Sequence, residues 1–127
     1  MSYQFTIIVP VYNEEDNLKR VEQELSNYIK IASKKTKVLF VNDGSKDNSQ
    51  QLIEEICTNN TDFDFINLEK NCGLSAAITA GFKNVDTELV GYIDSDLQTA
   101  PEDFNLLLKE IEHYDLVTGV RANRKDS

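Results

Sequence analysis

The sequence predicts an α/β domain of three layers, in which a mainly parallel sheet lies between two layers of helices. The first observation is that short apolar runs rich in Val, Ile and Phe alternate with longer segments whose apolar residues recur at helical spacing. Such alternation is typical of parallel strands joined by right-handed helical crossovers. The second observation is that polar residues directly follow the apolar runs. Because ligands of such sheets bind beyond the carboxyl ends of the strands, the sequence also predicts a binding site there.

The first expected strand covers residues 5–10, an almost unbroken β-branched and aromatic run that is typical of burial on both faces. Pro10 has no N–H to donate to a neighbouring strand, so we expect the strand to end there. Asn13 then has the pattern of a helix cap, with acidic residues at 14–16 in the first turn. The apolar stripe of this amphipathic helix consists of Leu18, Val21, Leu25 and Tyr28.

The second strand is expected at residues 38–41, followed by a glycine turn at 42–45. Asp47 is placed to cap the next helix. The apolar face of that helix consists of Leu52, Ile53 and Ile56. The polar residues 59–62 then interrupt the helical pattern, so we expect the helix to end there.

The third strand is expected at residues 63–68, and a helix rich in small residues at 75–82. Alanine and glycine on such a helix permit close approach to a sheet or a ligand. A capping box with proline in its first turn, at 99–102, predicts a further helix. Residues 115–119 have the pattern of a fifth strand, before a polar tail at 121–127. With neither an internal repeat nor a linker-like stretch, residues 1–127 are expected to form a single domain.

The fourth strand and the residues after it carry the clearest candidate for metal chemistry. Residues 89–93 form an apolar run, and Asp94, Asp96 and Gln98 follow at alternating positions. Side chains two residues apart point to the same side of an extended segment, so these three can converge. Carboxylate and amide oxygens suit Mg²⁺ or Mn²⁺ and suit zinc poorly. The alternative is a polar turn that ends a strand, because a D-x-D tripeptide is common in loops.

Composition excludes several classes of function. The chain has 127 residues and a formal net charge of −9, without a dense cluster of Lys or Arg, which argues against nucleic acid as a partner. Cys57 and Cys72 lack metal-ligand spacing and are typical of a reducing compartment. The first residues lack the pattern of a signal peptide, and no apolar run approaches the length of a membrane span. We therefore expect a cytoplasmic protein.

Five short motifs follow one another along almost the whole chain. They occupy residues 9–14 with 17–18, residues 41–47, residues 71–73 with 77 and 81, residues 94–98 with 101–102, and residues 119–121. Each motif alone is a weak signal, but their order and spacing together resemble the family two glycosyltransferases. Within that family, the D-x-D-L-Q form and Arg121 are most similar to the dolichyl-phosphate mannosyltransferases and bacterial polyprenyl-phosphate glycosyltransferases.

The resemblance implies a GT-A fold, a UDP- or GDP-linked sugar as donor, and Mg²⁺ or Mn²⁺ as cofactor. The residues that it assigns to the nucleotide sugar are Pro10, Tyr12, Glu14, Asp43, Asp94, Ser95 and Arg121. The metal ligands that it implies are Asp94, Asp96 and Gln98, of which Asp96 is the catalytic residue. The metal would neutralise the charge that develops on the departing diphosphate.

Several of these residues also have ordinary structural interpretations. Tyr12 could pack against the sheet, Glu14 could balance a helix dipole, and Asp43 could form an Asx turn beside the glycine. Asn42 stands where an acid is common in the motif, and we assign the function to the following Asp43. Lys70 could approach the nucleotide, although a solvent-facing lysine is the favoured interpretation.

In the resembling family, sequence beyond the position of Ser127 builds the acceptor site, so residues 1–127 are expected to be the donor-binding N-terminal part of a longer, truncated transferase. The implied reaction transfers the sugar with inversion to a polyprenyl phosphate (dolichyl or undecaprenyl). A saccharide hydroxyl as acceptor, or a non-catalytic nucleotide-sugar-binding module, are the alternatives. The full-length protein would lie in the cytoplasm, either free or at the inner face of the membrane. A nucleotidyltransferase would carry a glycine-rich loop after the first strand. A phosphoacceptor signalling domain would carry paired acids at the end of that strand. The chain has neither pattern at that place.

Overall fold

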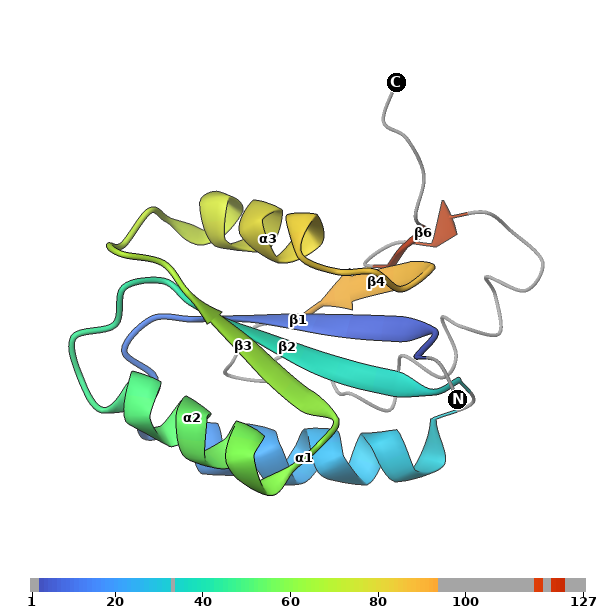
Figure 1. Ribbon diagram of the computed structural model, residues 1–127, viewed down its shortest axis with the longest axis horizontal. Coiled ribbons are helices and arrows are strands. Elements are labelled where there is room, and N and C mark those ends of the chain that lie inside the picture. Colours follow the sequence, from blue (N-terminus) through green and yellow to red (C-terminus); the bar gives the residue numbers. More distant parts are fainter. Residues whose placement is uncertain (1–2, 33, 94–115, 118–119, 123–127) are drawn as a thin grey trace.

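The computed structural model describes residues 3–32, 34–93, 116–117 and 120–122. In chain order its elements are β1 (Phe5–Val11), α1 (Leu18–Ile31), β2 (Thr36–Asn42), α2 (Ser49–Asn59), β3 (Phe63–Asn67), α3 (Leu74–Lys83), β4 (Leu89–Tyr92), β5 (Leu116–Val117) and β6 (Val120–Ala122). The strands form one six-stranded sheet in the order β3-β2-β1-β4-β6-β5. Helices α1 and α2 cover one face of this sheet, and α3 covers the other (Figure 1).

The strands β3, β2, β1 and β4 run parallel to their neighbours. In the register of the central pair, Phe5 lies opposite Thr36 and Val11 opposite Asn42. Parallel neighbours require crossover connections, and the helices α1, α2 and α3 supply them. The predicted three-layer α/β fold with a mainly parallel sheet is therefore confirmed.

The strand expected at 115–119 is found as β5 at the described residues 116–117, but the sequence did not predict the second strand, β6. Strands β5 and β6 pair antiparallel with each other. Strand β6 also pairs antiparallel with β4, with Gly91 opposite Val120 and Val90 opposite Arg121. Only two residues separate β5 from β6, a separation that suits antiparallel pairing and is far too short for a parallel crossover. Arg121 thus belongs to a strand and not to a polar tail.

The expected end of β1 at Pro10 is also wrong, because Pro10 lies buried inside the strand, opposite Val41. The carbonyl of Ile8 accepts the amide of Ile93, so Ile8 turns its backbone groups towards β4. Pro10, two residues on, turns the same way, and the pairing of β1 with β4 ends at Ile8. The missing N–H of Pro10 therefore removes no hydrogen bond from the ladder with β2.

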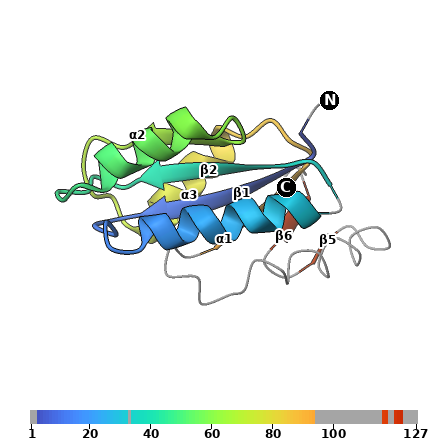
Figure 2. The ribbon, with the colours of Figure 1, turned by 90° about the horizontal axis from the view of Figure 1, so that it is seen from below.

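Two apolar clusters fill the spaces on either side of the sheet. The larger lies under α1 and α2, which lie side by side on that face (Figure 2). It includes all four residues of the stripe predicted for α1, together with Ile53 and Ile56 of α2. The smaller cluster lies under α3 and consists of Ile8, Leu39, Val41, Ala77 and Val90. The predicted inner faces of both α1 and α2 are therefore confirmed.

Helix α3 approaches the sheet closely because it carries small residues. Gly81 is buried, and a Cβ added to it would lie 2.8 Å from Cγ2 of Ile8 in β1. The expectation that alanine and glycine permit close packing of this helix is confirmed. Within the described residues, no helix combines the length and the hydropathy that a membrane crossing requires.

Candidate functional site

Three loops meet at the edge of the sheet where β1, β2 and β3 end. We call residues 12–17 the first loop, residues 43–48 the second loop and residues 68–73 the third loop. Because the three strands are parallel, their carboxyl ends lie at one edge. Hydrogen bonds join the second loop directly to each of the other two. The edge that was predicted to bind a ligand is therefore built from three connected loops.

The first and second loops exchange hydrogen bonds in both directions around Asn13. The amide of Asn13 donates to Oγ of Ser45 at 2.9 Å, and the amide of Lys46 donates to Oδ1 of Asn13 at 2.7 Å. Asn13 has a φ of 54°, a left-handed conformation that asparagine tolerates better than most residues. The prediction that Asn13 caps a helix is wrong, because its backbone turns towards the second loop and α1 begins only at Leu18.

Further bonds join the acidic residues expected in the first turn of α1 to the second loop and to Ser49, the first residue of α2. The amide of Glu14 donates to Oγ of Ser49 at 2.8 Å. The amide of Glu15 donates to Oδ2 of Asp47 at 3.2 Å, and the amide of Asn48 donates to Oε1 of Glu15 at 2.8 Å. These residues therefore connect the loops, and they lie outside α1.

Asp47 links the first loop to the start of α2. Its Oδ1 accepts the amide of Ser49 at 2.9 Å, as the predicted capping role requires, although Asn48 occupies the N-cap position itself. Burial alone would raise the pKa of Asp47, but hydrogen bonds from Ser49 and from the amide of Glu15 outweigh it and hold the pKa below its ordinary value of 3.8. Asp47 is therefore ionised near neutral pH while it contacts both segments.

The second and third loops meet at the carboxylate of Asp43, which is only 4% exposed. Its Oδ1 accepts the amide of Cys72 at 2.8 Å. Its Oδ2 accepts the amide of Gly73 at 3.0 Å and Nδ2 of Asn71 at 3.0 Å. One buried side chain thus receives three hydrogen bonds from three consecutive residues of the third loop.

Gly44 brings the backbones of the same two loops into contact. It has a φ of +71°, and a Cβ added to it would lie 2.4 Å from the backbone N of Asn71 and 2.4 Å from the backbone C of Lys70. No side chain fits at that distance from backbone atoms, so the loops can approach this closely only with glycine at this position.

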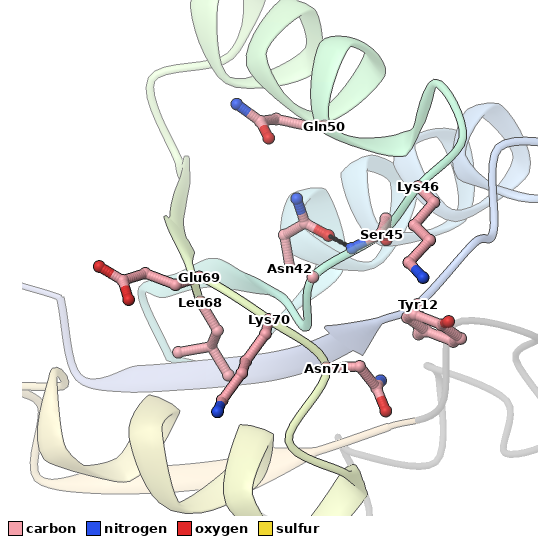
Figure 3. Close-up of a pocket in the computed structure, with 10 residues that line it drawn as sticks. Tyr12, Asn42, Ser45, Lys46, Gln50, Leu68, Glu69, Lys70 and Asn71 are labelled. Atoms are coloured by element: carbon pink, nitrogen blue, oxygen red, sulfur yellow. Dashed lines mark hydrogen bonds between the residues drawn. The ribbon is translucent and has the colours of Figure 1, made fainter.

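A cavity of about 550 Å³ lies between the three loops (Figure 3). Its lining consists of Tyr12, Asn42, Gly44, Ser45, Lys46, Gln50, Leu68, Glu69, Lys70 and Asn71. The side chain of Tyr12 is 41% exposed and stands next to Lys46 and Asn71 (Figure 3). The cavity therefore combines an aromatic ring, two lysines and several amide and hydroxyl groups, which suits a polar ligand with a flat ring and negative charge.

Of the residues assigned to the nucleotide from the sequence, Tyr12 lines this cavity. Pro10 and Glu14 do not belong to the lining. Pro10 is buried within β1, and Oε1 of Glu14 accepts a hydrogen bond from Nδ2 of Asn17 at 2.7 Å. Asp43 lies between two lining residues, but its carboxylate is directed at the third loop.

Several lining residues were not singled out by the sequence patterns. Asn42, the position set aside in favour of Asp43, lines the cavity and is held by its neighbours: its Oδ1 accepts the amide of Ser45 and its Nδ2 donates to Asn67. Lys70 is exposed, as expected, and also lines the cavity. The sequence analysis had named Lys70 as a residue that could approach the nucleotide, and it lies in the loop that follows β3, whereas Gln50 lies in the first turn of α2 and carries no such signal.

The predicted metal ligands Asp94, Asp96 and Gln98, together with Ser95, lie outside the described residues. Arg121 is placed by its backbone alone, in β6 opposite Val90. Within the described parts of the chain, no group of three or more His, Cys, Asp or Glu side chains is arranged to hold a metal ion.

The chemistry and the chain position of the predicted ligands fit a divalent metal. Strand β4 runs parallel to β1, and the amide of Ile93 still donates to the carbonyl of Ile8 at 3.1 Å. Asp94 is the next residue in the sequence, so the D-x-D-L-Q segment begins directly after the described end of this strand region. Two carboxylates and an amide oxygen are hard ligands of the kind that Mg²⁺ and Mn²⁺ prefer.

Known proteins resemble this chain both in sequence and in structure. The sequence model of the family described as Glycosyl transferase family 2 matches residues 6–127, which is nearly the whole chain. Among solved structures, that of S. aureus TarS 1–349 is similar over 87% of this chain and 33% of its own, with 26% identity and a TM-score of 0.68. A TarS structure in complex with UDP-GlcNAc matches equally well, with 25% identity.

Two more distant structures share the fold. The mannosyltransferase PcManGT from Pyrobaculum calidifontis, in complex with GDP-Man and Mn²⁺, has 21% identity and a TM-score of 0.73 over 91% of this chain and 34% of its own. Glucosyl-3-phosphoglycerate synthase from Mycobacterium tuberculosis, with Mn²⁺ and UDP, has 16% identity and a TM-score of 0.68 over 87% of this chain. The expected nucleotide-sugar transferase fold is confirmed. The chain spans about a third of the length of the TarS 1–349 and PcManGT structures, and 20% of the longer TarS structure.

Proposed function

The chain belongs to glycosyl transferase family 2, and we propose that it binds the nucleotide part of a nucleotide-diphosphate sugar in the cavity between the three loops. The observation that carries the proposal is that this cavity joins Tyr12 to Lys46 and Lys70 at the carboxyl edge of a parallel sheet. A nucleobase presents a flat face to stack on a ring and polar edges to the surrounding amides and hydroxyls.

Electrostatics support a phosphate-bearing ligand at this edge. The whole chain carries a formal net charge of −9, so its overall charge disfavours the approach of a diphosphate. Lys46 and Lys70 both line the cavity and offset that charge locally. Glu69, also in the lining, lies beside Lys70 and limits the positive potential on that side.

We assign a divalent metal to the residues that follow β4. Asp94, Asp96 and Gln98 would hold Mg²⁺ or Mn²⁺, which when bound neutralises charge on the departing diphosphate. The complexes of PcManGT and of the mycobacterial synthase contain Mn²⁺. Arg121 is the arginine of the Gly-x-Arg motif at 119–121 and would meet a phosphate through its planar donors.

For the full reaction we propose a polyprenyl phosphate as acceptor, on the basis of the D-x-D-L-Q form of the motif after β4. A phosphate oxygen would attack the anomeric carbon as the bond from that carbon to the diphosphate breaks, which inverts the configuration. Such an acceptor is already an anion and needs no general base. A saccharide hydroxyl would need one, and detection of a base-dependent transfer to a saccharide would favour that acceptor instead.

Isothermal titration with UDP and GDP, in Mn²⁺ and then in EDTA, tests the proposal. Binding should occur for at least one nucleotide, should weaken in EDTA, and should weaken about tenfold or more in Tyr12→Ala because a base loses its stacking partner. Tyr3→Ala is the matched control, since Tyr3 contacts Lys35, Lys37 and Asp62 away from the three loops. Equal losses in both tyrosine variants, or no nucleotide binding by the wild-type chain, would contradict the proposal.

A further inference from the structure

We propose that the side chain of Asp64 blocks the outer edge of β3 and so prevents this strand from pairing with a second copy of the chain. The inference is independent of the proposed nucleotide site. Strand β3 is the first in the order of the sheet, so among the described residues it has a neighbouring strand on one side only. Such an edge presents backbone donors and acceptors to which another strand can be added.

The backbone groups of three β3 residues face away from the sheet. The carbonyl of Asp62 and the amide of Leu68 both bond to β2, so these two residues turn their backbone groups towards that strand. Backbone groups alternate in direction along a strand, so Asp64 and Ile66 also turn towards β2. The residues whose amides and carbonyls face outwards are therefore Phe63, Phe65 and Asn67.

The amide at the centre of this outer edge is already occupied. Phe65 is the middle residue of β3, and its amide donates to Oδ1 of Asp64 at 2.8 Å. The amide of Phe63 donates to the carbonyl of Asn60, just before the strand, at 3.2 Å. Two of the three outward donors thus have acceptors in their own chain, and the acceptor of the central one is the side chain of Asp64.

The other residues of β3 are well suited to pairing with a further strand. Residues 63–67 read Phe-Asp-Phe-Ile-Asn, in which Asp64 is the single charged residue and neither proline nor lysine occurs. Aromatic and β-branched residues favour strands, whereas charge and proline are common means of protecting an edge. The protection of β3 within these five residues therefore falls to Asp64, whose side chain is exposed.

A second copy of β3 matches this edge in register. Because Phe65 is both central and outward-facing, a twofold axis would place it opposite Phe65 of the second copy, each amide donating to the other carbonyl. Asp64 would then lie opposite Ile66 of the second copy, which brings a carboxylate beside an apolar side chain. Asp64 thus opposes this pairing both by occupying the central amide and by its charge.

Pairing at this edge would bring the second copy close to the cavity between the three loops. Strand β3 leads directly into the third loop, and Leu68 and Glu69 of that loop line the cavity. The block at Asp64 therefore keeps a second copy away from this wall of the cavity.

Sedimentation velocity over a range of protein concentrations, in reducing buffer, tests the proposal. We expect Asp64→Ala to self-associate about tenfold or more tightly than the wild type, because each copy gains a central donor and loses a charge. The reducing buffer excludes disulfides, since Cys72 is exposed and the loss of Asp64 lowers the pKa of Cys57. Burial, and then the charge of Asp64, raise the pKa of that thiol to about 12.

Two further variants separate the hydrogen bond from the charge. Asp64→Asn keeps an acceptor for the Phe65 amide without the charge, so it should associate less tightly than Asp64→Ala. Glu55→Ala is the matched control, because Glu55 is exposed on α2 and its loss changes the net charge equally. This control should behave as the wild type does. Association of Asp64→Ala no tighter than that of the wild type, of Glu55→Ala or of Asp64→Asn would overturn the proposal.

A backbone change shows whether the association uses the edge of β3. N-methylphenylalanine at position 65, introduced by chemical ligation into the Asp64→Ala chain, keeps the side chain and removes the outward donor. This chain should stay monomeric at concentrations where Asp64→Ala associates. In Asp64→Ala itself, hydrogen exchange of the Phe65 amide should slow as the protein concentration rises. Association that persists after N-methylation, or exchange at Phe65 that does not slow, would indicate another surface and overturn the proposal.

Discussion

The second loop is attached to its two neighbours in different ways. Its junction with the first loop is distributed over several hydrogen bonds, in which each loop both donates and accepts. Its junction with the third loop is concentrated at two adjacent residues, the buried carboxylate of Asp43 and the close backbone contact of Gly44. The first junction is largely exposed, and the second is almost closed to solvent at its centre.

This difference predicts how each junction responds to substitution. An exposed hydrogen bond that is lost can be replaced by water, and neighbouring bonds still hold the loops together. A buried carboxylate or a backbone contact has no such substitute. The concentrated junction should therefore be sensitive to single changes and the distributed junction tolerant of them.

Gly44→Ala should give the largest effect, a loss of about 3 kcal/mol in the free energy of unfolding, because it adds a steric clash to an unfavourable φ. Gly73→Ala is the matched control. Gly73 also has a positive φ, of +102°, but a Cβ added there meets nothing within 4 Å. It should cost less than Gly44→Ala, on the order of 1–3 kcal/mol, because it adds backbone strain (φ 102°, ψ 163°) without a steric clash. Urea unfolding of both variants measures the difference, and equal losses would mean that the loops separate without cost.

Asn13→Ala should give a smaller effect, about 1–2 kcal/mol, because it removes the bond from the Lys46 amide and places alanine at a φ of 54°. Asn13→Gly loses the same bond but adopts this φ freely, so it should cost less than about 1 kcal/mol. Urea unfolding separates the two contributions. A loss in Asn13→Gly as large as that of Gly44→Ala would contradict the distributed character of this junction.

The fold was largely predictable because burial determines which residues are apolar within each short segment of the sequence. Strands buried on both faces must be continuously apolar, and the stripes of α1 and α2 recur at helical spacing, so both patterns survive in a single sequence. The hairpin of β5 and β6 was not predictable, since strands this short are defined by the strand with which they pair and not by their own composition.

The site was predictable in its position but not in its contacts. Topology places the polar residues after β1, β2 and β3 at one edge, and this follows from the order of elements alone. The bonds between the loops join residues about thirty positions apart, as between Asp43 and Gly73 (separation 30). Local patterns suggested Asn13 as a helix cap because nothing near it in sequence indicates that its partners are Ser45 and Lys46.

We expect the smallest effect on stability for Asp47→Asn, since Asp47 belongs to the distributed junction and acts mainly through its charge. Hydrogen bonds lower its pKa in the folded state below 3.8, so its stabilising contribution is fully present above that value and is lost as the pH falls through the folded-state pKa. The free energy of unfolding of the wild-type chain should therefore exceed that of Asp47→Asn at about pH 6, and the difference should shrink towards about pH 3. At each pH, the free energy of unfolding of the variant is subtracted from that of the wild type. This removes the contribution of the other carboxyl groups, which titrate in both proteins. A difference that stays constant over this range would mean that the ionised carboxylate of Asp47 stabilises the fold no better than its protonated form does, which would contradict the prediction.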